Sequence, residues 1–447
     1  MGMKKQSLKR QALITGASTA LVRAMGFLLR LYISRLLGAE ALGVMELASG
    51  VHMLALTPAA AGLPQAVSRL TAKAKDRRER ERVLYAGRRL ALIMGLFLTP
   101  VYLLLSPFLA QWMGDERALP ALLLFAPCML TVGLSSVYDG YFFGQGKALP
   151  PAISEGAEQI VRLAAVAALA GLVPLITPAY RAALPAFASS LGEAAGLLVI
   201  LPLAGRITSF RRDPKEKETR KALLRLSLPL LLNRLVHTGL RSVCNAVIPL
   251  RLMAGGLDKA EAMSRLGMLG GMVMPIMFLP CMASGALSAV GGPAVARCAA
   301  RKTESRLIRR LLLSALAVGT ACAGGLYLSA PYIARWVYRL PELTPLLQNA
   351  CPLAVILPVQ QMAGGLMTGL GLQRRSLRAS LLGSAALLLC AWQWTPGFGI
   401  LGTARAYMAG HGLTLFCELV FLAGRDKEPD SRCEAGKRIV QKTRPDL

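Results

Sequence analysis

Hydrophobic residues follow one another in long runs, separated by short stretches that are rich in Lys and Arg. A run of about 20 residues forms a helix of about 30 Å, which is the thickness of the hydrocarbon core of a membrane. The pattern therefore predicts an all-α polytopic membrane protein with about twelve transmembrane helices. The predicted spans are 12–36, 41–66, 88–111, 119–143, 151–174, 183–205, 223–250, 266–296, 311–333, 346–370, 377–395 and 399–423.

The two halves of the chain repeat one pattern. Arg23 and Arg30 lie seven residues apart in the first predicted span, and Arg234 and Arg241 have the same spacing in the seventh. Parallel repeats of this kind predict two six-helix lobes related by a pseudo-twofold axis along the membrane normal, with a substrate handled between them. The predicted parts are an N-terminal segment 1–11, an N-lobe 12–205, a linker 206–222, a C-lobe 223–424 and a tail 425–447.

Basic residues are unevenly shared between the two faces of the predicted bundle. Of the 52 Lys and Arg residues, about 38 lie in connections on the side of the N-terminus and about eight on the opposite side. Because basic loops stay in the cytoplasm, we predict that both termini are cytoplasmic, in a multi-pass protein of the bacterial cytoplasmic membrane. No small-residue cleavage site follows the first hydrophobic run, so we expect this helix to be retained.

Composition agrees with a membrane protein: 54% of the residues are hydrophobic, 17% are charged, and the net charge is +28. The positive charge lies in loops, where it suits anionic membrane lipids, and no basic stripe interleaved with aromatic residues predicts nucleic-acid binding. The nine cysteines are scattered without metal-ligand spacing, and no phosphate-binding GxxxxGK[ST] motif is present. We predict no cofactor, no metal and no enzymatic activity.

Arginines inside the predicted spans raise the free energy of inserting these helices into the membrane. Each costs about 2.5–3.5 kcal/mol near the membrane centre on insertion scales, so four of them facing lipid would be prohibitive. We predict that Arg23, Arg30, Arg234 and Arg241 line a polar cavity and bind the substrate. The alternative is that acidic residues neutralise them and that the pairs only join helices.

Other polar residues in the spans are candidates for the same site. Glu158 and Arg162 are spaced i, i+4, which fits a local salt bridge as well as a substrate contact. Asn233 and His237 lie beside the arginines of the seventh span and are candidates for hydrogen bonding to the substrate. Glu46 and Glu193 are candidate proton or cation sites, or partners of the arginines.

Proline and glycine recur at comparable depths of the second and eighth spans, where they free backbone groups and allow bending. They are either hinges for alternating access or static kinks. The residues are Pro58, Gly62, Pro64, Pro275, Pro280 and Gly285.

Several stretches, taken in order, resemble the multidrug/oligosaccharidyl-lipid/polysaccharide (MOP) exporter superfamily. They are "LVRAMGFLLRLYISRLLGAEALGVMELA", "GLPQAVSRLTA", "GYFFGQGKALPPAISEGAEQIVR" and "LSLPLLLNRLVHTGLRS". Within it they are most similar to the stage V sporulation protein B and polysaccharide flippase branch, which is related to lipid II flippases. The resemblance implies a V-shaped transporter that moves a lipid-linked saccharide between leaflets.

The resemblance also bears on individual residues. In lipid II flippases, cavity arginines of the first helix are functional, and Arg23 and Arg30 fall at matching motif positions. Arg234 or Arg241 is the nearest equivalent of the arginine on the helix that opens the second lobe. Two departures are the absence of two further spans associated with the lipid tail, and Leu31 where an acid follows the second arginine.

We therefore predict a flippase that moves an anionic undecaprenyl-linked saccharide, a peptidoglycan precursor or a polysaccharide unit, to the outer leaflet by alternating access. One alternative is a cation-coupled multidrug exporter of the MATE type, for which deep acids rather than arginines are expected. The other is a non-transporting scaffold for cell-wall synthesis. Expected partners are the lipid-linked oligosaccharide, anionic lipids and cell-wall synthesis enzymes, with the protein as a monomer.

Overall fold

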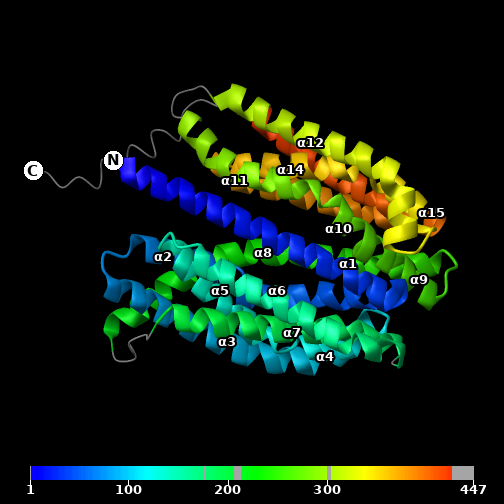
Figure 1. Ribbon diagram of the computed structural model, residues 1–447, viewed down its shortest axis with the longest axis horizontal. Coiled ribbons are helices and arrows are strands. Elements are labelled where there is room, and N and C mark those ends of the chain that lie inside the picture. The colour runs from blue at the N-terminus through cyan, green and yellow to red at the C-terminus, as the bar shows by residue number, and fades with distance from the viewer. Residues whose placement is uncertain (1, 176, 206–212, 300–303, 425–447) are drawn as a thin grey trace, which may run out of the picture.

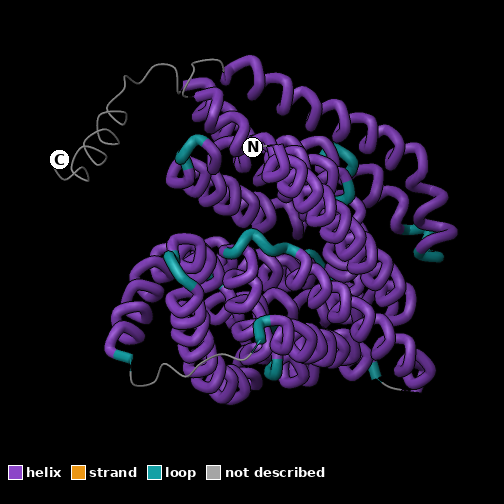
Figure 2. Tube along the Cα trace, turned by 60° about the vertical axis from the view of Figure 1, so that its left-hand side comes forward, coloured by secondary structure: helices purple, strands orange, loops and turns teal. Residues whose placement is uncertain are grey.

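The computed structural model describes residues 2–175, 177–205, 213–299 and 304–424, and every element in these ranges is helical (Figure 1, Figure 2). The elements are α1 (Gly2–Ala60), α2 (Leu63–Lys73), α3 (Arg77–Trp112), η1 (Glu116–Ala118), α4 (Leu119–Phe125), α5 (Cys128–Gly144), α6 (Leu149–Leu169), η2 (Ala170–Leu175), α7 (Pro178–Leu203), α8 (Pro214–Ala254), α9 (Lys259–Leu266), η3 (Gly267–Val273), α10 (Met274–Met277), α11 (Pro280–Ala299), α12 (Glu304–Tyr332), η4 (Ile333–Val337), α13 (Leu343–Ala350), α14 (Leu353–Gly369) and α15 (Gln373–Ala423).

The two longest sequence stretches of helix, α1 and α15, each turn back on themselves at a glycine. Gly38 (φ 77°, ψ 169°) and Gly399 (φ 59°, ψ −145°) have backbone angles that are essentially confined to glycine. The arms on either side of each turn then run antiparallel: Arg30 pairs with Glu46 across the first turn. Across the second turn, the hydroxyl oxygens of Thr395 and Thr403 lie 3.0 Å apart. Both turns lie at the junction of two predicted spans.

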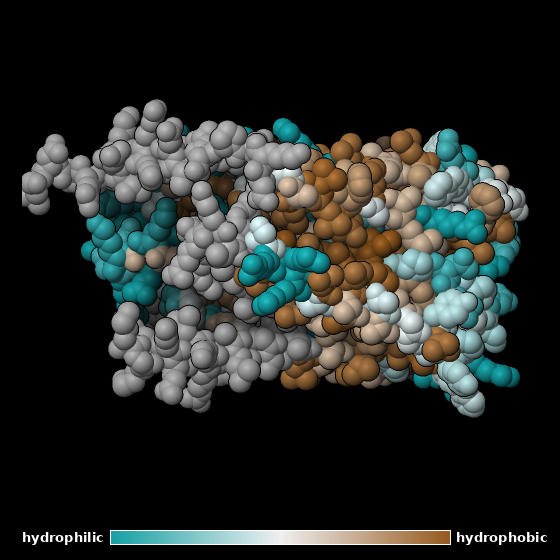
Figure 3. Space-filling model, turned by 90° about the horizontal axis from the view of Figure 1, so that it is seen from above, coloured by the Kyte–Doolittle hydropathy of each residue, from teal (hydrophilic) through white to brown (hydrophobic). Residues whose placement is uncertain are grey.

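The molecule has the surface of a multi-pass membrane protein. Among the described residues, seven helices are long and apolar enough to cross a membrane, or up to eight if the bent pair Glu116–Phe125 and Cys128–Gly144 counts as one span. A hydrophobic belt separates two more hydrophilic ends (Figure 3). Large apolar side chains such as Leu104 and Leu328 are 82% and 76% exposed, as expected of side chains that face lipid. The count of twelve spans stays a prediction.

The helices form two groups with α1 between them. Figure 1 shows α2–α7 on one side of α1, and α11, α12, α14 and α15 on the other. Two helices extend beyond their predicted spans, while the predicted division of the chain into lobes, linker and tail stays a prediction. The helix α1 already begins at Gly2, inside the segment 1–11, and α8 begins at Pro214, inside the linker 206–222. The tail 425–447 lies outside the described residues.

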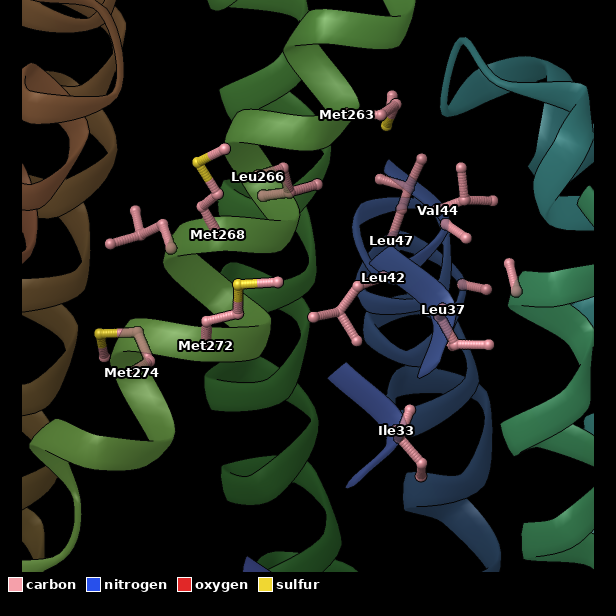
Figure 4. Close-up of a cluster of buried hydrophobic side chains, with 14 of the residues drawn as sticks. Ile33, Leu37, Leu42, Val44, Leu47, Met263, Leu266, Met268, Met272 and Met274 are labelled. Carbon is pink, nitrogen blue, oxygen red and sulfur yellow. The ribbon is translucent and has the colours of Figure 1, made fainter. Parts of the chain in front are cut away.

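The two halves of the chain meet closely at the end of the bundle where Gly38 lies. A methyl group built on Gly43 of α1 would overlap the backbone carbonyl oxygen of Met263, and one built on Gly267 would overlap that of Ala39. Apolar side chains of α1, α9 and η3 surround this crossing (Figure 4). Small residues let helix backbones approach in this way, which stabilises helix pairs inside a membrane.

An ionic cluster lies at the same end. The fully buried Asp115 carboxylate contacts the Arg117 guanidinium at 2.8 Å and the Lys259 ammonium at 3.5 Å, and Arg117 also contacts Glu40. Burial alone would raise the pKa of Asp115, but the hydrogen bonds and charge of Arg117, together with Lys259, bring it below its usual range. The Asp115 cluster therefore joins η1, α1 and the start of α9 by charge.

Helix breaks occur among the proline and glycine positions noted in the second and eighth spans, although Pro58 and Gly285 themselves lie inside α1 and α11. α1 ends at Ala60 and Gly62 has a φ of 85° before α2 begins. In the C-terminal half, η3 is a π-helical stretch and α10 ends at Met277, three residues before Pro280 opens α11. The breaks are present at both predicted places, and their role as hinges stays a prediction.

Candidate functional site

A cavity of about 680 Å³ lies inside the bundle between α1, α4–α7 and α8, and we call it the central cavity. Polar and charged side chains from five helices line it. They are Arg30, Glu46, Ser49, His52, Cys128, Arg162, Ser189, Glu193, Arg234, Thr238, Arg241, Ser242 and Asn245. The structure thus brings together six of the residues that the sequence predicted for the site, from four different helices.

Arg30 and Glu46 form an ion pair in the wall of this cavity. The turn at Gly38 places the two residues opposite each other on the antiparallel arms of α1. Arg30 also donates a hydrogen bond to the carbonyl oxygen of Gly270 at 3.2 Å, so its side chain links α1 to η3. The Arg30 side chain is 41% exposed. Its guanidinium is therefore held in place and still accessible from the cavity.

Arg162 lies between two acids. Its guanidinium contacts the carboxylate of Glu158, one turn away on α6, at 2.6 Å, and that of Glu193 on α7 at 2.7 Å. The salt bridge of the i, i+4 pair is therefore present, and Arg162 also lines the cavity, whereas its contact with a substrate stays a prediction. Two carboxylates share one cation here, so the group carries an excess negative charge when both acids are ionised.

Arg234 and Arg241 reach the central cavity from α8, where their spacing of nearly two turns puts them on one face. Both side chains are exposed to the cavity or to solvent. Among the residues that the structure describes, neither guanidinium has an acidic partner. These two arginines therefore supply the uncompensated positive charge of the central cavity.

Arg23 faces a second cavity, of about 550 Å³, which we call the C-half cavity. Arg241 lines both cavities, so the two spaces meet at this side chain. The four arginines were predicted to line a polar cavity, and the structure places Arg23 and Arg30 in the walls of two different cavities. The polar residues of the C-half cavity are Arg23, Arg241, Cys281, Gln360, Gln361, His411 and Glu418.

Two predicted site residues, Asn233 and His237, have side chains outside the described part of the structure. Glu158 contacts the cavity residue Arg162 without lining the central cavity itself. Among the described residues, no group of three His, Cys, Asp or Glu side chains has the geometry of a metal site.

Sequence reasoning missed His52 and most of the C-half cavity. His52 is 5% exposed and stacks on Phe125 with ring centroids 4.2 Å apart, while its buried Nδ1 has no hydrogen-bond partner in the described residues. His411 and Glu418 were not among the predicted site residues although they lie seven residues apart, which is the same spacing that drew attention to the arginines. That spacing could have identified them as one polar face of the last helix.

Comparison with known proteins assigns the family. Residues 8–299 match the family model described as "Polysaccharide biosynthesis protein", which covers more than half of the chain. The chain belongs to this family. It is similar to "Stage V sporulation protein B" of Bacillus subtilis (strain 168), with 27% identity over 432 residues that cover 91% of this chain and 82% of that protein.

Solved structures confirm the fold. The lipid II flippase MurJ in an inward closed conformation has a TM-score of 0.74 and 13% identity, over 92% of this chain and 87% of that one. An inward-facing multidrug resistance MATE family transporter of the MOP superfamily has a TM-score of 0.73 and 18% identity, over 91% and 98%. The predicted all-α membrane fold is therefore confirmed, and the predicted resemblance to the stage V sporulation protein B and polysaccharide branch is confirmed by the family model and the relative.

Proposed function

We propose that the protein is a flippase that moves an anionic, undecaprenyl-linked saccharide from the inner to the outer leaflet by alternating access. The observation that carries the proposal is the pair Arg234 and Arg241, two guanidinium groups without an acidic partner in the described residues, on one face of an intramembrane cavity. Guanidinium groups bind phosphate oxygens through paired hydrogen bonds, and a lipid diphosphate offers several such oxygens. Two free arginines inside a membrane suit an anion.

The remaining site residues fit the same cargo. Arg30 and Arg162 are held by acids and extend the positive wall of the central cavity, while Arg23 continues it into the C-half cavity. As predicted from the sequence, we assign to Asn233 and His237 the role of hydrogen bonding to the saccharide. The names of the relatives, a sporulation protein and a lipid II flippase, support a cell-wall precursor or polysaccharide unit as cargo.

Energy coupling and topology belong to the proposal too. Glu158 and Glu193 share Arg162, so one of them can take up a proton without leaving the cation unpaired. Arg30 contacts Glu46 in the empty cavity and contacts the anionic cargo instead when the cargo binds. We place both termini in the cytoplasm and the protein, as a monomer, in the bacterial cytoplasmic membrane, among anionic lipids and beside cell-wall synthesis enzymes.

The MATE-like fold also fits a cation-coupled drug exporter. A cationic drug requires accessible acids, and in the central cavity Glu46 and Glu193 are each paired with an arginine. The charge of the cavity therefore favours an anionic cargo. A scaffold without transport activity has no use for arginines that cost free energy on insertion.

Reconstitution into liposomes tests the proposal. A fluorescent undecaprenyl-diphosphate saccharide is incorporated, and its exchange between leaflets is measured by quenching from outside. We expect exchange by the wild type and at least a tenfold loss in Arg241→Ala, because charge-assisted hydrogen bonds contribute about 1.5–3 kcal/mol and each 1.4 kcal/mol is a factor of ten.

Arg251→Ala is the matched control, since Arg251 lies on the same helix but donates its hydrogen bond to the Trp392 carbonyl oxygen. It should exchange the lipid like the wild type. A wild type that exports ethidium and leaves the lipid in place would show a drug exporter. No movement of either compound would support the scaffold alternative.

A further inference from the structure

Glu418 is an acid without a charged partner, enclosed in the C-terminal half. It lies on the second arm of α15 and is 3% exposed. One carboxyl oxygen, Oε1, accepts a hydrogen bond from the Ser376 hydroxyl at 2.9 Å. The other, Oε2, is buried and has no hydrogen-bond partner in the described residues. Half of the carboxyl group is therefore unsatisfied.

The surroundings of Glu418 do not compensate a negative charge. Its nearest neighbours are uncharged: the first arm of α15 contributes Ser376, and α14 contributes Gly364, where an added methyl group would lie 3.5 Å from Oε1. Ala363, next to Gly364, and Leu422, one turn along α15 from Glu418, belong to one buried apolar cluster. Burying a bare carboxylate in such a place is costly, whereas a neutral carboxyl group is tolerated.

Other acids of the cavities differ from Glu418 in this respect. Glu46 and Glu193, which line the central cavity, each contact an arginine. Glu418 forms no ion pair with any described residue. The difference singles out one acid whose charge is compensated most simply by a proton.

Glu418 also has a route to other titratable groups. It lines the C-half cavity together with Arg23 from α1, Arg241 from α8, Cys281 from α11 and His411 from α15. His411 is seven residues earlier on α15 and thus about 10 Å deeper on the same face, with its Nδ1 2.9 Å from the Gln360 side-chain oxygen. Glu418 itself lies within about 8 Å of the end of the helix, five residues before Ala423.

We propose that Glu418 is a proton-binding site through which a proton gradient drives the transporter. The proton enters onto Oε2 and leaves to water when the arms of α15 and α14 separate, because only hydration of the carboxylate permits its ionisation. Arg241 lines both cavities, so the negative charge of ionised Glu418 attracts its guanidinium while that group binds the anionic cargo. This coupling role rests on the proposed transport function, whereas the binding of the proton does not.

Infrared spectroscopy of the purified full-length protein tests proton binding without any transport assay. A protonated carboxyl group has a carbonyl stretch that is separate from the bands of carboxylates. We expect this band at neutral pH in the wild type, a clear loss of its intensity in Glu418→Gln, and no such loss in Glu46→Gln, because Glu46 is paired with Arg30. A band that is absent from the wild type, or unchanged in Glu418→Gln, would overturn the site.

Liposomes with an imposed pH gradient test the coupling. The measured quantity is the ratio of lipid exchange rates with and without the gradient, which does not depend on the basal rate. The ratio should exceed one in the wild type, fall to about one in Glu418→Gln, and keep its wild-type value in Glu261→Gln, an acid exposed on α9. An unchanged ratio in Glu418→Gln refutes the coupling, whereas absence of exchange in the wild type refutes the proposed function and leaves the infrared result standing.

Discussion

Partners divide the arginines inside the membrane into two kinds. Arg30 and Arg162 contact acids that also hold them in position, so their guanidinium groups are oriented before any ligand arrives. Arg234 and Arg241 have no such partner in the described residues. A bound anion would interact with the full positive charge of Arg234 and Arg241, whereas the acids partly neutralise the charge of Arg30 and Arg162. The arginines of α8 are therefore the centre of the proposed binding site.

The Arg30–Glu46 pair can be tested by a double-mutant cycle. Removing both partners separately and together, as Arg30→Gln and Glu46→Gln, should give a coupling free energy of about 1–2 kcal/mol for unfolding in mixed micelles. Removing one partner of a fully buried ion pair destabilises a protein by more than this. Arg30, however, is 41% exposed, and solvent weakens its interaction with Glu46.

The i, i+4 pair Glu261–Arg265 on α9 is the reference for a surface pair. Pairs of that kind contribute about 0.3–0.5 kcal/mol. A coupling free energy for Arg30–Glu46 that is no larger than this would show that the pair does not hold the arms of α1 together.

Sequence alone predicted which residues are costly inside a membrane, because cost depends on residue type and depth. It could not predict which arginine forms an ion pair with which acid. Arg30 meets Glu46 and Arg162 meets Glu193 only after separate helices have packed, and the i, i+4 pair Glu158–Arg162 is the one contact that spacing could reveal. The burial of Glu418 could not be predicted for the same reason, since it depends on packing against α14.

At the scale of the helices, the turns at Gly38 and Gly399 decide how the chain crosses the membrane. Each sits between two apolar runs and reverses the chain within one residue of unusual backbone angles. The runs themselves were visible in the sequence as predicted spans. The breaks near Gly62 and Pro280 were noted there as glycine and proline, whereas the turns at Gly38 and Gly399 were not, because their angles depend on the packing of the arms.

Alanine at Gly399 should destabilise the protein by about 1–3 kcal/mol, because a positive φ of 59° with an extended ψ is strained for a residue with a side chain. No neighbouring atom opposes the added methyl group, so the effect isolates the backbone strain. The measurement is the free energy of unfolding in mixed micelles.

Gly397→Ala is the control for this substitution. Gly397 lies two residues away, also has open space around it, and has an ordinary helical backbone. It should be neutral or slightly stabilising, since alanine is the better helix former. Equal destabilisation by both substitutions would argue against strain at the turn.

For the molecule as a whole, the crossing of Gly43 and Gly267 and the Asp115 cluster close one end of the bundle, while the two halves hold the central and C-half cavities between them. Alternating access requires that this end open. At the crossing of Gly43 and Gly267 backbone contacts backbone, so no flexible side chain can change its rotamer to relieve a clash. The two helices must move apart as rigid bodies. The crossing is thus the place where a single methyl group has the largest effect on the arrangement of the halves.

Gly43→Ala should push the end of the bundle apart. Its methyl group would overlap the Met263 carbonyl oxygen, and a backbone atom cannot rotate away as a flexible side chain can. Spin labels at positions 116 on η1 and 260 on α9, in a variant without native cysteines, report the distance between the halves by electron–electron double resonance. We expect a longer and broader distance distribution in Gly43→Ala than in the parent.

Gly26→Ala serves as the control on the same helix, because a methyl group there meets only the Gln159 side-chain oxygen at an ordinary 3.7 Å. Its distances should match those of the parent. If Gly43→Ala also matched the parent, the Asp115 cluster rather than the glycine crossing would hold this end closed. The transport rate then supplies a second measure, since a bundle end that is forced open should slow the return to the closed arrangement and lower lipid exchange.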